Sequence, residues 1–297
     1  MTELAQLVLN GLGFGSILSI MAVGLTFVYG TLRIVNIAHG DYVVFGAYVA
    51  FVANVMLGIP ILLAAIIAIL VTIVFGIALE FSLWRPLRRR GAKLLSMLIV
   101  SIGLALIVRH SISLVFGVDR RRYNVDVRSM YEFAGLRVAQ TNLAVIATSV
   151  ILVILVSLAL SSTRTGKVLR ALADDRDLAS ACGIDSDRLT VHAWTLGSGL
   201  AGIGGVLLGL LQTSFDPNSG WNVLLMVFAA VILGGIGNAY GALVAGIAIG
   251  IAMDLSTWSA LAGGLSPIHK PIVAFSLLVI VLLVRPHGLF GQARRSA

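Results

Sequence analysis

Long apolar blocks alternate with short polar segments along the whole chain. Five blocks are each about long enough to cross a hydrocarbon core of ~30 Å as a helix. These blocks are Leu4–Tyr29, Ile61–Trp84, Leu94–Phe116, Leu143–Leu160 and Leu189–Leu211. Shorter apolar elements lie at Tyr42–Leu57, Val223–Leu233, Tyr240–Met253 and Ile272–Val284. The pattern predicts an all-α, polytopic membrane bundle of about eight to nine membrane elements, as one transmembrane domain over residues 1–297.

Two glycine-marked stretches predict interrupted elements. The segment Val223–Leu233 is shorter than the ~17 residues that a span needs, and GGIGN follows it, so we expect half of a broken or re-entrant helix. A polar cluster, NIAHGD, follows the first long block. The sequence AHGDYVVFGAYVA after that block resembles GIGNAYGALVAGIA after the short element. This resemblance suggests an internal duplication.

Composition argues against a water-soluble fold, since the chain is 59% hydrophobic and only 11% charged, against roughly 25% charge in soluble domains. Cys182 is the single cysteine, so neither an internal disulfide nor a cysteine-based metal site is expected. The sequence contains no GxxxxGK[ST], HExxH or GxSxG motif. We therefore expect no cofactor or metal in this chain, and no enzyme activity.

The net charge of +8 is better explained by membrane topology than by nucleic-acid binding, because basic residues mark the loops held in the cytoplasm. The run RPLRRRGAK, from Arg85 to Lys93, has five basic residues and no acid. Alternation from there places residues 161–188 and the C-terminal tail inside, and residues 117–142 outside. The assignment of residues 117–142 to the outside is an exception to the rule that basic loops lie in the cytoplasm, because that loop holds several arginines.

The longest inner loop, at about residues 163–189, predicts a short surface helix from about Lys167 to Cys182 that stops at Gly183. One interpretation is a solvated helix on the membrane surface. The other is a docking helix that fits a groove on a soluble partner.

Four segments resemble a known family. The loop sequence GKVLRALADDRDLASACGID resembles the cytoplasmic coupling loop of ABC importer permeases. With GLTFVYGTLRIVNIAHGDYVVFGAYVAF, AVILGGIGNAYGALVAG and VRPHGLFG, nearly the whole chain is similar to permeases of branched-chain amino acid importers of the Liv type, specifically the shorter of the paired permeases.

The resemblance implies an ATP-driven importer that carries branched-chain or related hydrophobic amino acids into the cytoplasm. Its implied partners are a second, related permease, two ABC ATP-binding subunits that hydrolyse ATP, and an extracytoplasmic substrate-binding protein. The implied location is the cytoplasmic (inner) membrane of a prokaryote, with the chain in contact with lipid and its C-terminus in the cytoplasm.

Two groups of candidate residues follow from this resemblance. The ATPase-coupling group is Gly166, Lys167, Arg170, Ala171, Asp174, Asp175, Ala181, Gly183 and Ile184. The gate or path group is Asn36, His39, Gly40, Asp41, Gly234, Gly235, Gly237 and Asn238.

The first members of the gate or path group have two interpretations. Asn36 can cap the next helix, and the helix dipole favours Asp41 near that helix N-terminus. Alternatively, His39 and Asp41 line the substrate path or touch the ATPase. We expect this cluster on the cytoplasmic side. For three other residues we expect structural roles. Arg109 and Glu80 lie near span ends, and their side chains extend to the membrane surface. Trp221 belongs to an interfacial aromatic belt.

Two other functions remain open. The same fold carries urea or short amides in related permeases. A stand-alone secondary transporter or channel is a further alternative, but it typically needs paired acids deep in the bundle, and the centres of these blocks have almost none.

Overall fold

The chain folds as a helical membrane bundle. The computed structural model describes residues 2–125, 130–133, 136–164, 166–168, 185–259 and 265–290. Six of the described helices are long and apolar enough to cross a membrane. They are α1 (Thr2–Leu32), α3 (Ile61–Leu79) extended by η2 (Glu80–Trp84) and α4 (Arg85–Arg89), α5 (Leu94–Phe116), α6 (Gln140–Ser162), α9 (Ser186–Leu211) and α12 (Lys270–Val284) preceded by η3 (Pro267–His269).

Three further helices are shorter: α2 (His39–Phe51), continued by the π-helical turn η1 (Val52–Met56), α10 (Ser219–Gly234) and α11 (Ala239–Leu255). Strands β1 (Met130–Phe133) and β2 (Leu136–Ala139) form an antiparallel hairpin. All nine predicted apolar elements therefore form helices.

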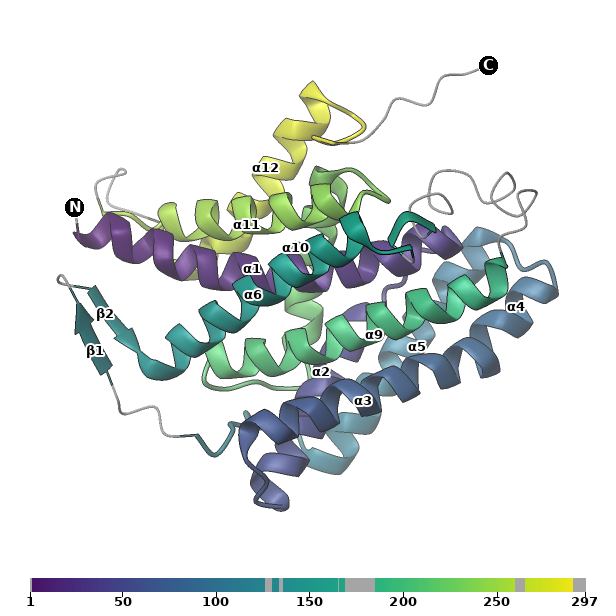
Figure 1. The fold of residues 1–297 in the computed structure, drawn as a ribbon, viewed down its shortest axis with the longest axis horizontal. Coiled ribbons are helices and arrows are strands. Elements are labelled where there is room, and N and C mark those ends of the chain that lie inside the picture. The colour runs from purple at the N-terminus through teal and green to yellow at the C-terminus, as the bar shows by residue number, and fades with distance from the viewer. Residues whose placement is uncertain are drawn as a thin grey trace.

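The long helices give the bundle two distinct ends. In Figure 1, α1, α3, α6 and α9 run side by side, with the N-terminus and the β-hairpin at one end and α4 at the other. We call these the hairpin end and the basic end. At the basic end, Arg85 of α4 donates a hydrogen bond to Asp187 of α9 over 2.7 Å. At the hairpin end, Ser259 donates one to Glu3 over 2.7 Å.

Local chemistry sets several helix boundaries. Asp185 caps α9, because its carboxylate accepts hydrogen bonds from the Asp187 and Arg188 amides. Asn238 caps α11 by accepting one from the Gly241 amide at 3.0 Å. Gly235 ends α10 with φ of +102°, a backbone conformation that glycine adopts without a steric penalty.

Helices α1 and α9 form the centre of the bundle. In their most apolar windows, 89% of α1 residues and 72% of α9 residues are buried, against 6% for α12. Small residues allow the close contacts. A Cβ on Gly15 of α1 would lie 2.9 Å from Ile247 of α11, and one on Gly24 of α1 would lie 3.0 Å from the Gly197 carbonyl of α9. The spaced glycines thus serve helix packing within the chain.

The contacts reveal two halves of opposite orientation. Helix α1 packs against α9, α10 and α11, and α9 packs in the same way against α1, α2 and α3. Likewise, α2 contacts α3 and α5, and α10 contacts α11 and α12. Helices α1 and α9 run in opposite directions (Figure 1). Helices α1, α2, α3 and α5 therefore correspond to α9, α10, α11 and α12, with α6 between the halves.

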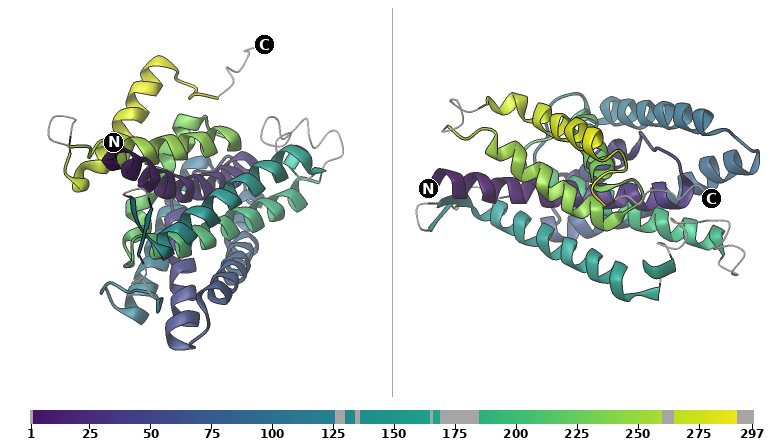
Figure 2. Two further views of the ribbon diagram at one scale, coloured as in Figure 1. Left: turned by 60° about the vertical axis from the view of Figure 1, so that its left-hand side comes forward. Right: turned by 90° about the horizontal axis from the view of Figure 1, so that it is seen from above.

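This correspondence corrects our sequence-based pairing of the repeats. The segment after Ala38 was matched with the one after Gly235, which would relate α2 to α11. By packing, the counterpart of α2 is α10, and the counterpart of α11 is α3. Both segments carry glycines that make close backbone contacts, Gly46 with Gly202 and Gly241 with Gly234. Seen from above, α5 and α12 lie along one flank of the bundle and α6 along the other (Figure 2).

Candidate functional site

The starts of the two short helices, α2 and α10, meet inside the bundle. A Cβ on Gly40 would collide with the Gly220 carbonyl, and a Cβ on Gly220 would collide with the Gly40 carbonyl. The same Gly40 Cβ would lie 3.0 Å from Leu224. The backbones of the two helices thus touch directly, and the contact is reciprocal between the two halves of the fold.

A charged pair lies beside this junction. Arg109 of α5 donates hydrogen bonds from Nε to Asp41 Oδ1 at 3.0 Å and from Nη2 to Asp41 Oδ2 at 3.3 Å. The Asp41 side chain is 1% exposed and that of Arg109 is 14% exposed. The Arg109 guanidinium also lies 5.1 Å from the ring centroid of Trp221 on α10, a cation–π distance. Arg109 thereby links the two short helices.

His39 and Asn36 are also buried near this junction. The His39 ring nitrogen Nε2 lies 3.0 Å from the Met21 carbonyl of α1. The Asn36 side chain accepts a hydrogen bond from the Ala38 amide at 3.1 Å, and this holds the turn before α2. The residue at the N-cap of α2 is Ala38, which makes no side-chain capping bond. Asn36 therefore shapes the chain that enters the helix and is not its cap.

The cluster lies deep in the bundle. Met21 lies well before the end of α1 at Leu32, so the chain returns from the basic end into the bundle before α2 begins. His39 and Asp41 are accordingly buried at the helix junction, away from the basic end. The segment can return because Arg33 takes φ of +54° directly after α1.

The second glycine break is covered by the end of the described chain. Leu289 donates a backbone hydrogen bond to the Leu233 carbonyl at 2.8 Å, and Phe290 donates one to the Gly234 carbonyl at 3.2 Å. The Asn238 side chain donates to the Phe290 carbonyl at 3.0 Å. Gly235 is buried and Gly237, with φ of +89°, is partly buried. The break between α10 and α11 is therefore a fixed turn that is held by the segment after α12.

The structure describes only part of the coupling group. Gly166 is buried against the end of α6, where its Cβ would lie 2.5 Å from the Leu160 carbonyl, and Lys167 is exposed. The other members lie outside the described residues: Arg170, Ala171, Asp174, Asp175, Ala181, Gly183 and Ile184. After the undescribed segment, Asp187 binds Arg85 at 2.7 Å and Arg89 at 3.9 Å.

Sequence reasoning missed the partner of Asp41 and misjudged Glu80. Both Arg109 and Glu80 were expected to extend to the membrane surface. Instead, Arg109 binds Asp41 inside the bundle, and Glu80 is buried in an ion pair with Arg88. The available signal was an ionisable residue inside an apolar block, which by default marks an internal pair. Trp221, for which we expect an interfacial position, also contacts Arg109.

The site thus combines a buried ion pair, a backbone contact between two short helices and a fixed turn. Among the described residues, no group of three or more His, Cys, Asp and Glu side chains could hold a metal ion.

Comparison with known proteins gives a consistent result. The family model described as "Branched-chain amino acid transport system / permease component" matches residues 7–283. The chain is 33% identical to the high-affinity branched-chain amino acid transport system permease protein LivH of Salmonella typhimurium, over 97% of this chain and 95% of that protein. It is 30% identical to BraD of Pseudomonas aeruginosa, over 97% and 95% of the two chains.

More distant similarities extend this picture. LivM of Escherichia coli, also a branched-chain amino acid transport system permease protein, is 25% identical over 93% of this chain and 68% of its own length. Among solved structures, PsaBC from Streptococcus pneumoniae in complex with Fab has a similar fold, with a TM-score of 0.51 and 12% identity over 94% of this chain and 91% of that one.

Proposed function

The chain belongs to the branched-chain amino acid transport permease family, and we propose that it is the membrane-spanning subunit of an ATP-driven importer. It is a multi-pass transport subunit and not an enzyme. The proposed cargo is a branched-chain or related hydrophobic amino acid, moved into the cytoplasm. The observation that carries the proposal is the family match over residues 7–283.

The proposed assembly contains a second, related permease. Similarity to both LivH and LivM, which are permease proteins of one kind of transport system, supports such a pair. Two ATP-binding subunits on the cytoplasmic side would hydrolyse ATP, and a substrate-binding protein would deliver the amino acid to the outer side. The cytoplasmic membrane of a prokaryote is the proposed location, with the basic end and the C-terminus inside.

In the proposed mechanism, ATPase closure moves the loop at residues 163–189. Both sides of this loop join long helices, since Gly166 packs on the end of α6, and Asp187 lies in the first turn of α9 and binds α4. Movement of the loop would therefore turn α9 against α1 and shift the junction of α2 and α10. Such a rigid-body shift between packed helices can switch access across the membrane.

Uptake by the reconstituted assembly tests the proposal. The purified chain, its partner permease, the ATPase pair and the binding protein are placed in proteoliposomes, and uptake of labelled leucine is measured. We expect uptake that requires ATP and the binding protein and that unlabelled isoleucine or valine inhibits. If only urea or amides compete, the proposed cargo is wrong and the importer carries those compounds. Uptake by this chain alone without ATP would overturn the ATP-driven mechanism.

Loop variants test the coupling step. Gly183→Pro and the charge reversal Asp174→Lys are expected to abolish ATP-coupled uptake of leucine, because both alter the segment proposed to engage the ATPase. Membrane insertion, measured by immunoblotting of membrane fractions, is expected to stay unchanged. Normal uptake in both variants would refute this role of the loop.

A further inference from the structure

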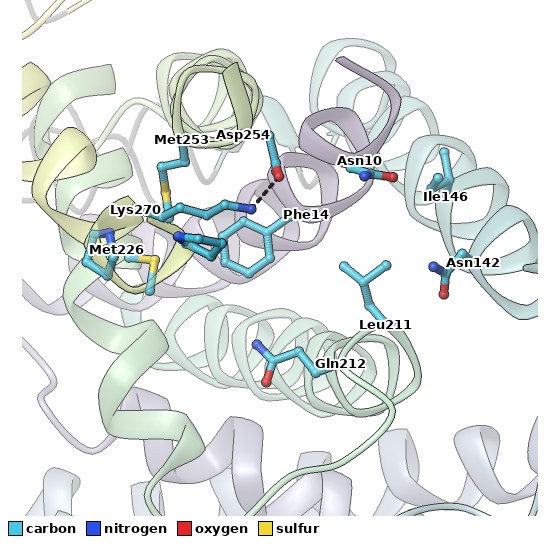
Figure 3. A pocket seen from close by; sticks show the side chains of 12 residues that line it. Asn10, Phe14, Asn142, Ile146, Leu211, Gln212, Met226, Met253, Asp254 and Lys270 are labelled. Atoms are coloured by element: carbon cyan, nitrogen blue, oxygen red, sulfur yellow. Dashed lines mark hydrogen bonds and ion pairs between the residues drawn. The ribbon is translucent and has the colours of Figure 1, made fainter. Parts of the chain in front are cut away.

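A cavity near the hairpin end is distinct from the junction of α2 and α10. Its volume is about 420 Å³, within the ~300–1,000 Å³ range of small-molecule pockets. Its lining residues come from α1, α6, α9, α10, α11 and the start of α12 (Figure 3). The cavity is therefore built by both halves of the fold and by the helix between them.

One wall of the cavity carries an opposite-charge pair. Lys270 of α12 and Asp254 of α11 point toward one another, with Nζ 2.5 Å from Oδ1 (Figure 3). The Asp254 side chain is 9% exposed and that of Lys270 is 27% exposed. The pair thus combines a buried anion with a partly accessible cation, and together they are neutral.

The rest of the lining is mainly apolar or uncharged. Phe14 lies next to the ion pair, and Met226 and Met253 contribute flexible thioether side chains (Figure 3). Methionine adapts to differently branched apolar groups. Gln212 at the end of α9 contributes a neutral amide.

We propose that this cavity is a vestibule site for a zwitterionic aliphatic amino acid, bound by Asp254 and Lys270 at its charged end and by Phe14, Met226 and Met253 at its apolar end. The proposal rests on the proposed transport function, and it adds a binding site within this chain. The ligand ammonium binds the Asp254 carboxylate and the ligand carboxylate binds the Lys270 ammonium.

Charge balance gives this site its selectivity. A zwitterion opens the ion pair and supplies a new partner to each charge, so neither is left unpaired. A ligand that lacks the carboxylate, such as leucinamide, leaves Lys270 without a new partner, and unpaired charges in such a site are costly. Lysine and glutamate add a charged side chain to the apolar region formed by Phe14 and the two methionines. Aliphatic zwitterions are therefore selected over amides and charged amino acids.

Photolabelling with photo-leucine, a diazirine analogue of leucine, tests the site in the complete transporter in proteoliposomes without ATP. We expect mass spectrometry to find the label on peptides that contain Phe14, Met226 or Met253. Leucine, isoleucine and valine should compete, and leucinamide, lysine and glutamate should not. Equal competition by all six compounds, or no label at this cavity, would overturn the proposal. This competition profile is measured on the wild-type transporter, so it does not depend on whether a variant folds.

Variants provide a second readout. Asp254→Asn combined with Lys270→Met is expected to lower labelling by about tenfold or more, because it removes both charge-assisted contacts. Lys270→Arg keeps the cation and should retain labelling within about threefold of wild type. Lys93→Met, the same chemical change at the exposed start of α5, is the matched control and should leave labelling unchanged. Unchanged labelling in the double variant would overturn the proposal.

Leucine uptake by proteoliposomes that contain the wild-type transporter separates this inference from the proposed function. ATP-dependent leucine uptake with an unlabelled cavity would overturn only the vestibule site. Absence of any ATP-dependent uptake by the complete assembly would overturn the transport proposal and, with it, the site.

Discussion

At the residue scale, the Asp41 carboxylate and the Arg109 guanidinium form a charged pair inside an otherwise apolar junction. The two residues are 68 positions apart in the sequence, so no local spacing could predict their contact. Sequence alone selects Asp41 as a candidate, because an acid beside a glycine break is conspicuous in an apolar chain. Its partner became evident only from the packing of α5 on α2.

The pair predicts a distinct pattern of stability. Removal of either partner, by Asp41→Leu or Arg109→Leu, leaves a buried charge without its counter-ion, which typically costs ~3–5 kcal/mol. The double variant leaves neither charge, so it should be clearly more stable than either single variant. The apparent melting temperature of the purified chain in detergent measures this coupling.

An exposed ion pair provides the control for this cycle. Arg120 lies 3.9 Å from Asp216, with a side chain that is 77% exposed, and such pairs contribute only ~0–1 kcal/mol. Arg120→Leu should therefore leave the melting temperature nearly unchanged. Additive destabilisation by Asp41→Leu and Arg109→Leu would contradict the buried-pair interpretation.

At the element scale, the positions of the helices followed from the sequence and their pairing did not. Among the described residues, apolar block length predicted every membrane element, including the short helix that ends at Gly234. The π-helical turns η1 and η2 and the β-hairpin were not predicted, because none of these local structures produces a characteristic spacing of apolar residues. The pairing of α2 with α10 depends on a backbone contact at Gly40, which no repeat in the sequence indicates.

Gly40→Ala tests this contact. The added Cβ meets the Gly220 carbonyl, so α2 and α10 must separate, and overpacking of this kind typically costs ~1–3 kcal/mol. We expect a lower melting temperature and reduced leucine uptake by the assembly. Gly103→Ala in α5 is the matched control, because nothing lies within 4 Å of its Cβ, and it should be neutral or slightly stabilising. Equal effects of the two substitutions would exclude close packing as the cause.

At the scale of the whole molecule, basic residues lie at both ends. The basic end gathers the arginines of α4, and the hairpin end has the cavity with its neutral ion pair and the arginines of the loop after α5. The sequence-based topology assigns the basic end to the cytoplasm, and this assignment also predicts which loops are accessible from outside the cell.

Accessibility of Cys182 measures that orientation. It is the single cysteine of the chain and belongs to the loop expected inside. A membrane-impermeant maleimide should leave it unmodified in intact cells and modify it after permeabilisation. Arg120→Cys in a Cys182→Ser background should react in intact cells, since Arg120 belongs to the loop expected outside. Reaction of Cys182 in intact cells would reverse the proposed orientation.

The Asp41–Arg109 pair also has a consequence for biosynthesis. The ribosome completes α2 and must add all of α3 and α4 and about two thirds of α5 before Arg109 exists. During that interval the nascent α2 carries an acid with no counter-ion, so lipid is an unfavourable environment for it. Helix α2 should therefore remain at the translocon or the membrane surface and enter the bundle only when α5 arrives.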